Sequence, residues 1–377
     1  MKIRLKINNA AIIYTLFAIV FIGGHILRIQ PLIVNFLIAL VGLWALLYSV
    51  LKKKINGINA YLILAGVLYS VFMILSLFYN GNADYMDLLW IWAYMGIAIL
   101  TYEFRISKQV YWNIAYAIII LVCIYVIMGG AADDLLSIGS QNNISAYIIF
   151  FVLMSYLSVM KEKKLIKYYI SFLTLAISLW TGSRAGIIAS FLLIIGTFFY
   201  NFLAIKGQKI KSLIKWFALI LFSIWTVNHF FGKYLLGLVD KINRYGGTSI
   251  RTEIWREYIL GVLSNAGNFI FGADTSNVMY RWLSFYSGNT HNSFLMLHAK
   301  FGIVALLMVI ILLFIVLHKS IREKNYIMMV TVIVAIARMF FDWISFPGLY
   351  DILFWYMFLY ALDKEEYGRQ MKEQLNE

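Results

Sequence analysis

Apolar runs of about 20 residues alternate with short polar connections along most of this chain. A run of that length crosses the hydrocarbon core of a bilayer as a helix. The pattern predicts twelve membrane-spanning helices, at residues 10–28, 31–51, 59–79, 86–102, 109–128, 143–160, 165–181, 184–204, 213–231, 290–317, 326–345 and 349–362. We therefore expect an all-α integral membrane protein in which residues 1–377 form a single polytopic domain.

The connections between these runs are short, with one main exception. Residues 232–289 form a connection long enough to hold helices of its own. Within it, Ile250, Ile254 and Tyr258 recur at helical spacing, which predicts a helix with one apolar face lying in the membrane interface. Two other connections, at 181–184 and 345–349, are so tight that they predict helical hairpins.

The number and placement of the charged residues agree with the predicted membrane spans and also predict their orientation. Only 13% of the residues are charged, against about 25% in soluble domains. A net charge of +14 would suit a nucleic-acid partner, but the cations sit at alternate ends of the apolar runs, so we expect none. With the N-terminus inside, 22 of the 32 Lys and Arg residues fall on inner connections, as the positive-inside rule requires. Both termini should be cytoplasmic, and residues 232–289 should face outward.

Ten cations remain on the outer side or within spans, where positive charge is disfavoured. They are Arg28, Arg184, Lys233, Lys241, Arg244, Arg251, Arg256, Arg281, Lys300 and Arg338. Six of them lie in the 232–289 connection. A cation kept in such a place needs an anionic partner or a function. For Arg338 the simplest partner is Asp342, four residues later, in a structural pair along one helix.

The first motif is at an outer hairpin, where the sequence reads Thr181-Gly182-Ser183-Arg184-Ala185-Gly186. Small residues at 182, 186 and 190 recur every four positions and would let another helix approach closely. Arg184 is about 200° away around a helix, so it should face a cavity instead. The alternative is an arginine whose head reaches the lipid headgroups.

The second motif, Ser249-Ile250-Arg251-Thr252-Glu253-Ile254-Trp255-Arg256, opens the expected interfacial helix. Ser249 is a suitable N-cap. Arg251 would lie in the first turn, where free backbone N–H groups favour an anion, and its guanidinium suits forked bonding to phosphate. The alternative is a charged residue on the wet face of the helix.

The third motif, Thr290-His291-Asn292-Ser293, opens the span at 290–317, and Gln141-Asn142-Asn143 precedes the span at 143–160. Taken in order, these motifs resemble the O-antigen ligase and O-antigen polymerase superfamily, over about residues 140–305. One departure is Lys300, where relatives often carry an acidic residue.

The resemblance implies a GT-C-like fold in a bacterial plasma membrane and a metal-independent glycosyltransferase without a cofactor. Its donor and acceptor would be oligosaccharides on undecaprenyl pyrophosphate, at the outer face. Arg184 and Arg251 would hold the pyrophosphate, and His291 would activate the acceptor hydroxyl. The further substrate-binding candidates are Asn143, Arg244, Arg256, Arg281 and Asn292.

Other functions remain open at this stage. A polymerase moves the growing chain to another lipid-linked repeat unit, and a ligase moves it to lipid A–core or a related acceptor; we favour the polymerase. Its expected partners, besides membrane lipid, are chain-length regulator and flippase proteins. A transporter or lipid flippase is the alternative of another class, but the cations gather on one face, which suits a fixed outer site.

Overall fold

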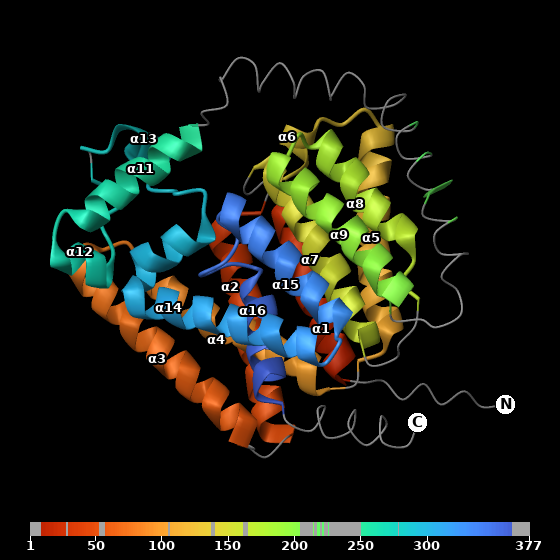
Figure 1. The fold of residues 1–377 in the computed structure, drawn as a ribbon, viewed down its shortest axis with the longest axis horizontal. Helices are drawn as coiled ribbons and strands as arrows, with labels where there is room; N and C mark the ends of the chain where they lie inside the picture. Colours follow the sequence, from red (N-terminus) through yellow and green to blue (C-terminus); the bar gives the residue numbers. More distant parts are fainter. Residues whose placement is uncertain are drawn as a thin grey trace.

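The computed structural model describes residues 9–27, 29–52, 57–104, 106–136, 140–160, 165–203, 250–277 and 279–363, with a few isolated positions between 214 and 225. Every regular element in these ranges is a helix (Figure 1). The helices are α1 (Asn9–Ile26), α2 (Pro31–Lys52), α3 (Gly57–Asn80), α4 (Tyr85–Glu103), α5 (Lys108–Ile127), α6 (Ala132–Leu135), α7 (Gln141–Val159), α8 (Tyr168–Trp180), α9 (Arg184–Leu203), α11 (Ile250–Leu263), α12 (Ala266–Phe271), α13 (Arg281–Phe285), α14 (Ser293–Arg322), α15 (Tyr326–Phe341) and α16 (Asp351–Leu362).

Eight of these helices are long and apolar enough to cross a membrane, namely α1, α2, α3, α4, α5, α7, α9 and α14. Three more, α8, α15 and α16, are apolar but have only 13, 16 and 12 residues. All eleven coincide with predicted spans to within a few residues. The predicted span at 213–231 lies almost wholly outside the described residues. The chain is thus a multi-pass helical membrane protein, and the count of twelve spans stays a prediction.

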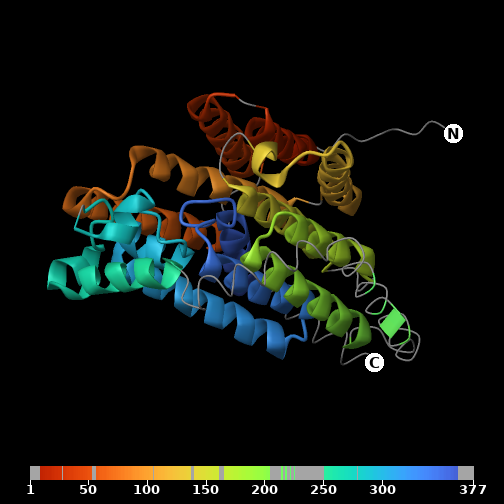
Figure 2. The same cartoon turned by 90° about the horizontal axis from the view of Figure 1, so that it is seen from above.

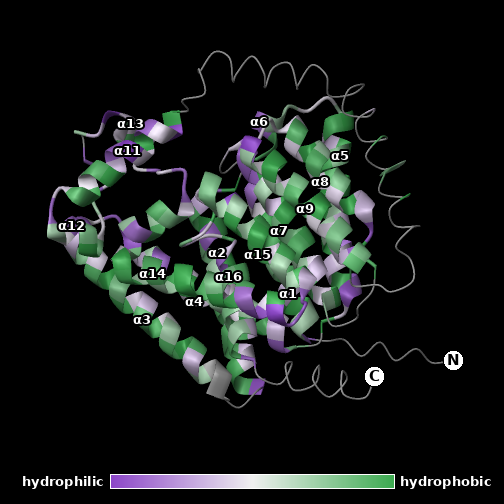
Figure 3. Cartoon of the chain, viewed as in Figure 1, coloured by the Kyte–Doolittle hydropathy of each residue, from purple (hydrophilic) through white to green (hydrophobic). Residues whose placement is uncertain are grey.

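Side chains on the rim of the bundle are the ones that suit a lipid environment. Phe78, Ile127, Phe191 and Phe314 are among the large apolar residues exposed there. In Figure 3, α5, α8 and α9 are coloured mostly hydrophobic along their length. In water such a surface would be an aggregation hazard, whereas in a bilayer it meets acyl chains.

The centre of the bundle is held by α16, which Figures 1 and 2 show between the other helices. It packs against α3, α4 and α14 and buries most of its side chains, including Trp355 and Tyr360. Small residues allow comparably close contacts elsewhere. A Cβ on Gly96 of α4 would lie 2.3 Å from the carbonyl oxygen of Gly42 in α2, so any larger residue would force these helices apart.

Helices α11, α12 and α13 form a separate group beside α14, away from α5, α8 and α9 (Figure 1). The apolar stripe predicted for the 250–262 segment is present, but it packs on protein. Ile254 and Tyr258 are buried with Leu283 of α13 and Ala299 of α14 in a small second core. The position of α11 in a membrane interface therefore stays a prediction, while its apolar face is explained by these neighbours.

Both predicted hairpins exist, with one difference in length. The α8–α9 connection is the three residues 181–183, as expected. The α15–α16 connection is longer than predicted, because α15 ends at Phe341 and residues 342–350 are not helical. This segment contains a cis peptide bond before Pro347. The carboxylate of Asp351 organises it by accepting hydrogen bonds from the backbone N–H groups of Phe346 (2.8 Å) and Gly348 (3.0 Å).

Candidate functional site

Arg184 is placed by the turn between α8 and α9. Gly182 adopts a φ of +61°, which glycine tolerates best, and the Ser183 hydroxyl oxygen then caps α9 by accepting a hydrogen bond from Gly186 N (3.1 Å). Gly186 also allows a tight helix contact, because a Cβ there would lie 2.5 Å from Ser145 Oγ of α7. Gly182 makes no such contact, so it serves the turn and not the packing face predicted for it.

The guanidinium of Arg184 is exposed at the first residue of α9. It forms no hydrogen bond or ion pair with any residue that the structure describes. Arg251 is close enough for the two positive charges to repel. A solvated arginine that faces a second arginine, with no carboxylate of its own, is poised to accept an anion from outside the chain.

Arg251 lies in the first turn of α11, as predicted, and is half-buried. Its Nη1 donates to the carbonyl oxygen of Phe341, the last residue of α15. Burial lowers the pKa of Arg251, and repulsion by Arg184 and Arg338 adds to the effect, against the opposing attraction of Asp342. An added anion would relieve this repulsion, which favours binding of a negatively charged group here.

His291 lies just before α14, with its backbone in the left-handed region at φ +50°. The side chain of Asn289 accepts a hydrogen bond from His291 N (2.8 Å), and the Tyr286 ring packs edge-on against the imidazole. The Nδ1 atom is 4.0 Å from Oδ1 of Asp342. This arrangement directs Nδ1 at a carboxylate and leaves Nε2 without a partner among the described residues, as a general base requires.

Asp342 connects the cluster. Its carboxylate is 3.3 Å from Arg338 Nη1, so the predicted pair exists, although Asp342 lies beyond the end of α15 in extended backbone. Burial raises the pKa of this carboxyl, but nearby His291 and the charges of Arg338 and Arg251 outweigh it and hold the pKa below its usual value. Asp342 is therefore an anion that His291, Arg251 and Arg338 share.

Arg338 is fully buried and joins this cluster to α7. Its Nη2 donates to the Asn142 carbonyl oxygen (2.8 Å) and to Ser145 Oγ (3.2 Å). Its Nε has no partner among the described residues. The side chain thus acts as a rigid support that fixes Asp342 between α7 and α14.

Asn292 and Ser293 attach the start of α14 to the end of α15. The Asn292 amide donates to the Phe340 carbonyl oxygen (2.9 Å), while its Oδ1 caps α14 by accepting from Phe294 N and Leu295 N. Ser293 Oγ donates to the Asp342 carbonyl oxygen (2.8 Å). Asn292 is thus a buried structural cap beside His291, and these bonds occupy the groups with which it was expected to meet substrate.

The other predicted substrate-binding residues lie apart from this cluster. Arg256 is exposed and pairs with Glu253 on the same helix at 3.6 Å. Arg281 is exposed at the start of α13, with its guanidinium over the Trp282 ring. Asn143 lines a cavity that Trp343 also lines. Arg244, together with Ser249, lies outside the described residues.

Two further groups can be compared with His291 as bases. His298 is buried, and both of its ring nitrogens are engaged: Nδ1 with Tyr258 Oη (2.6 Å) and Nε2 with the Phe269 carbonyl oxygen (2.9 Å). Asp274 accepts from Ser276 N and Oγ in a local turn. Of these three, His291 alone combines partial exposure with an orienting carboxylate.

Asp342 and Arg338 were not assigned a role at the site from the sequence. In the sequence, Arg338 and Asp342 are a charged pair near the expected outer end of a span, and this spacing predicts only a structural ion pair within one helix. Asp342 and His291, whose side chains lie 4.0 Å apart, are 51 residues apart in sequence, so local spacing does not reveal this contact.

The cluster combines Arg184, Arg251 and Arg338 with Asp342 and His291. Three guanidinium groups and one carboxylate leave a net charge of +2, which would be balanced by a pyrophosphate diester. Comparisons of the chain with models of protein families, with curated proteins and with solved structures found no match. The function must therefore be argued from this geometry.

Proposed function

We propose that the protein is a glycosyltransferase that polymerises oligosaccharide repeat units carried on undecaprenyl pyrophosphate, at the outer face of a bacterial plasma membrane. The observation that supports this most is a single cluster with two parts. Arg184 and Arg251 can bind an anion, and His291 lies beside them with its Nδ1 directed at the Asp342 carboxylate. A transferase needs both parts in one place, because the leaving group is anionic and the attacking group must lose a proton.

In the proposed reaction, a hydroxyl oxygen of the acceptor sugar bonds to the anomeric carbon of the donor. The bond between that carbon and the pyrophosphate oxygen breaks, and the lipid pyrophosphate departs with the electron pair. His291 Nε2 takes the hydroxyl proton, and Asp342 stabilises the imidazolium that forms. Arg184 and Arg251 stabilise the charge that develops on the pyrophosphate, without a role for a metal ion.

The resemblance of the ordered motifs to the O-antigen ligase and polymerase superfamily supports the same assignment. The three motif residues Arg184, Arg251 and His291 come from parts of the chain up to 107 residues apart. Arg251 and His291 both lie near Asp342, and Arg184 lies close enough to Arg251 for their charges to repel. A ligase would use the same cluster with a different acceptor.

Deleting the gene and measuring the length of surface glycans tests the proposal. Loss of a polymerase leaves single repeat units. Full-length polymer that stays on its lipid carrier would identify a ligase, and repeat units retained on the inner leaflet would identify a flippase. Complementation with His291→Ala, compared with the matched control His298→Gln, then asks whether the cluster carries the activity.

A further inference from the structure

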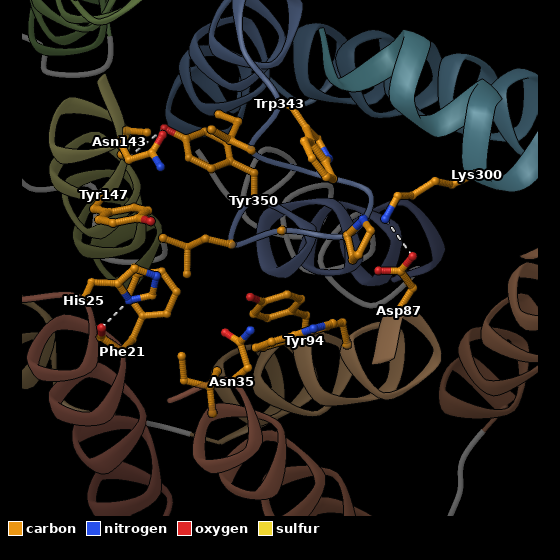
Figure 4. Close-up of a pocket in the computed structure, with 17 residues that line it drawn as sticks. Phe21, His25, Asn35, Asp87, Tyr94, Asn143, Tyr147, Lys300, Trp343 and Tyr350 are labelled. Carbon is orange, nitrogen blue, oxygen red and sulfur yellow. Dashed lines mark hydrogen bonds and ion pairs between the residues drawn. The ribbon is translucent and has the colours of Figure 1, made fainter. Parts of the chain in front are cut away.

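We propose that a cavity next to the cluster, whose lining charges Lys300 and Asp87 pair with each other, binds one neutral sugar ring of the substrate, an inference that rests on the proposed function. The cavity has a volume of about 280 Å³ and lies among α1, α2, α4, α7, α14 and the 343–350 segment. Figure 4 shows side chains from all of these elements around one space, with Lys300 and Asp87 at one end and Asn143 and Tyr147 at the other.

The charge of this cavity is balanced internally. Lys300 Nζ donates to Asp87 Oδ2 at 2.7 Å, and both side chains are more than nine-tenths buried. The ammonium also lies over the Trp343 ring, 5.1 Å from its centroid. A phosphate or carboxylate ligand would have to compete with Asp87 for Lys300, and both of these side chains are buried, so an uncharged ligand is favoured.

Several polar groups on the wall have hydrogen-bonding capacity to spare. Trp343 Nε1 is buried and has no hydrogen-bond acceptor among the described residues. Lys300 uses one of its three N–H donors on Asp87, and no described residue donates to Asp87 Oδ1. A buried indole N–H normally has a partner, so its isolation beside a cavity points to an acceptor supplied by a ligand.

Part of the remaining wall is aromatic, which matches the faces of a sugar. Trp90 and Tyr94 stack on one another on α4, with centroids 5.2 Å apart, and Tyr147 faces them from α7. A pyranose presents C–H groups on its faces and hydroxyls at its edge, so it satisfies rings and polar groups together. The volume is at the lower end of small-molecule sites, about 300–1,000 Å³, which limits the occupant to about one ring.

The cavity shares two stretches of backbone with the catalytic cluster. Trp343 follows Asp342, and Asn143 follows Asn142, whose carbonyl oxygen holds Arg338. A ring bound against Trp343 would therefore contact the residue that follows Asp342 in the chain. This placement suits a sugar of the acceptor or donor that must be held still during transfer.

Saturation-transfer difference NMR on the full chain, in nanodiscs prepared without glycoside detergents, tests the proposal. The probes are methyl glucoside, methyl galactoside, methyl mannoside, methyl rhamnoside and the two N-acetylhexosamines, with glucuronate, glucose 6-phosphate and farnesol as comparisons. The variants are Trp343→Phe, which removes the N–H and keeps a ring, and Asp87→Asn combined with Lys300→Met, which removes both charges together. Trp112→Phe, on α5 and outside the cavity, is the matched control.

We expect a signal from at least one neutral glycoside and none from the two acidic sugars. Trp343→Phe should weaken binding by about three- to tenfold, as for the loss of one hydrogen bond, the double variant should abolish it, and Trp112→Phe should leave it unchanged. No signal from any neutral glycoside, equal binding by Trp343→Phe, or a farnesol signal that Trp343→Phe removes would each overturn the inference. Arg251→Ala should retain sugar binding while losing transfer, so failure here is distinct from failure of the proposed glycosyltransferase.

Discussion

Replacing Asp342 by Asn tests whether the carboxylate acts through His291. The substitution keeps the size of the side chain and removes its charge. At the observed 4.0 Å between Asp342 Oδ1 and His291 Nδ1, a full charge pair is worth about 4 kcal/mol at an effective dielectric constant of 20. Arg251 and Arg338 repel the same imidazolium and reduce the net value. We expect a loss of about 1.5–4 kcal/mol of transition-state stabilisation, or about 10- to 10³-fold in kcat.

The assay is turnover of purified protein with a lipid-linked repeat unit, alongside donor binding and thermal stability. Asp342→Asn leaves Arg338 buried without a charged partner, so stability must be measured separately. A double variant, Asp342→Asn with His291→Ala, isolates the coupling. If the two residues act as a unit, the double variant should be no slower than His291→Ala alone. Losses that multiply, or normal turnover by Asp342→Asn, would refute the proposed dyad.

The same variant makes a prediction about pH. The pKa of Asp342 lies below its ordinary value of 3.8, so the carboxylate contributes stability above that value and loses it only as the pH falls through the lower folded pKa. The difference in Tm between the native protein and Asp342→Asn should therefore not diminish from pH 8 to pH 5. It should shrink below about pH 4. A difference that disappears between pH 7 and pH 5 would contradict the assignment of the charge to Asp342.

Four other outcomes follow from the structure and the charge pattern. Arg251→Ala should lower turnover at least about 100-fold and weaken donor binding, and Arg251→Lys should restore little, because an ammonium lacks the fork of a guanidinium; full activity of Arg251→Ala would remove it from the site. In a Cys123→Ser background, an impermeant reagent should label a cysteine at 270 and not one at 206 in intact cells, and the reverse pattern would invert the topology. Turnover should persist in excess EDTA, whereas loss that magnesium or manganese restores would count against two-guanidinium catalysis. His298→Ala should lower the free energy of unfolding by about 2–4 kcal/mol, because it removes the hydrogen bonds to Tyr258 and Phe269. The turnover of the folded fraction should change less than about tenfold. A larger loss of turnover at unchanged Tm would make His298 a catalytic residue.

The helices could be predicted from the sequence because a bilayer imposes a length and a composition on each one. Eleven predicted spans match described helices, and the main error falls at the end of α15. There the apolar run continues through Trp343 and Ile344, but these residues are not helical. Both line a cavity, and Ile344 also belongs to the hydrophobic core. Hydropathy reports burial from water, and it does not separate a helix from an irregular segment that other helices enclose.

The candidate site could be predicted only where its chemistry was local. Arg184 and Arg251 stood out because each is a cation at an outer boundary, and His291 because it opens a span. The role of Gly182 was misassigned, since a spacing of four residues is compatible with a packing face and with a turn. Asn292 was assigned to substrate, although an asparagine directly before a helix is equally suited to capping it.

Lys300 shows most clearly why the remainder required a structure. In the sequence, Lys300 is a cation within an expected span and has no carboxylate nearby to pair with. The net charge near His291 therefore cannot be predicted from the sequence. The partner of Lys300, Asp87, is 213 residues earlier and opens α4, so no window of sequence contains both charges. Two residues after Lys300, α14 is interrupted at Gly302, where φ is +76° and a Cβ would lie 2.3 Å from the Ile270 carbonyl oxygen. The neutrality of the cavity, and with it the kind of ligand that we propose, follows from this long-range contact and from no local motif.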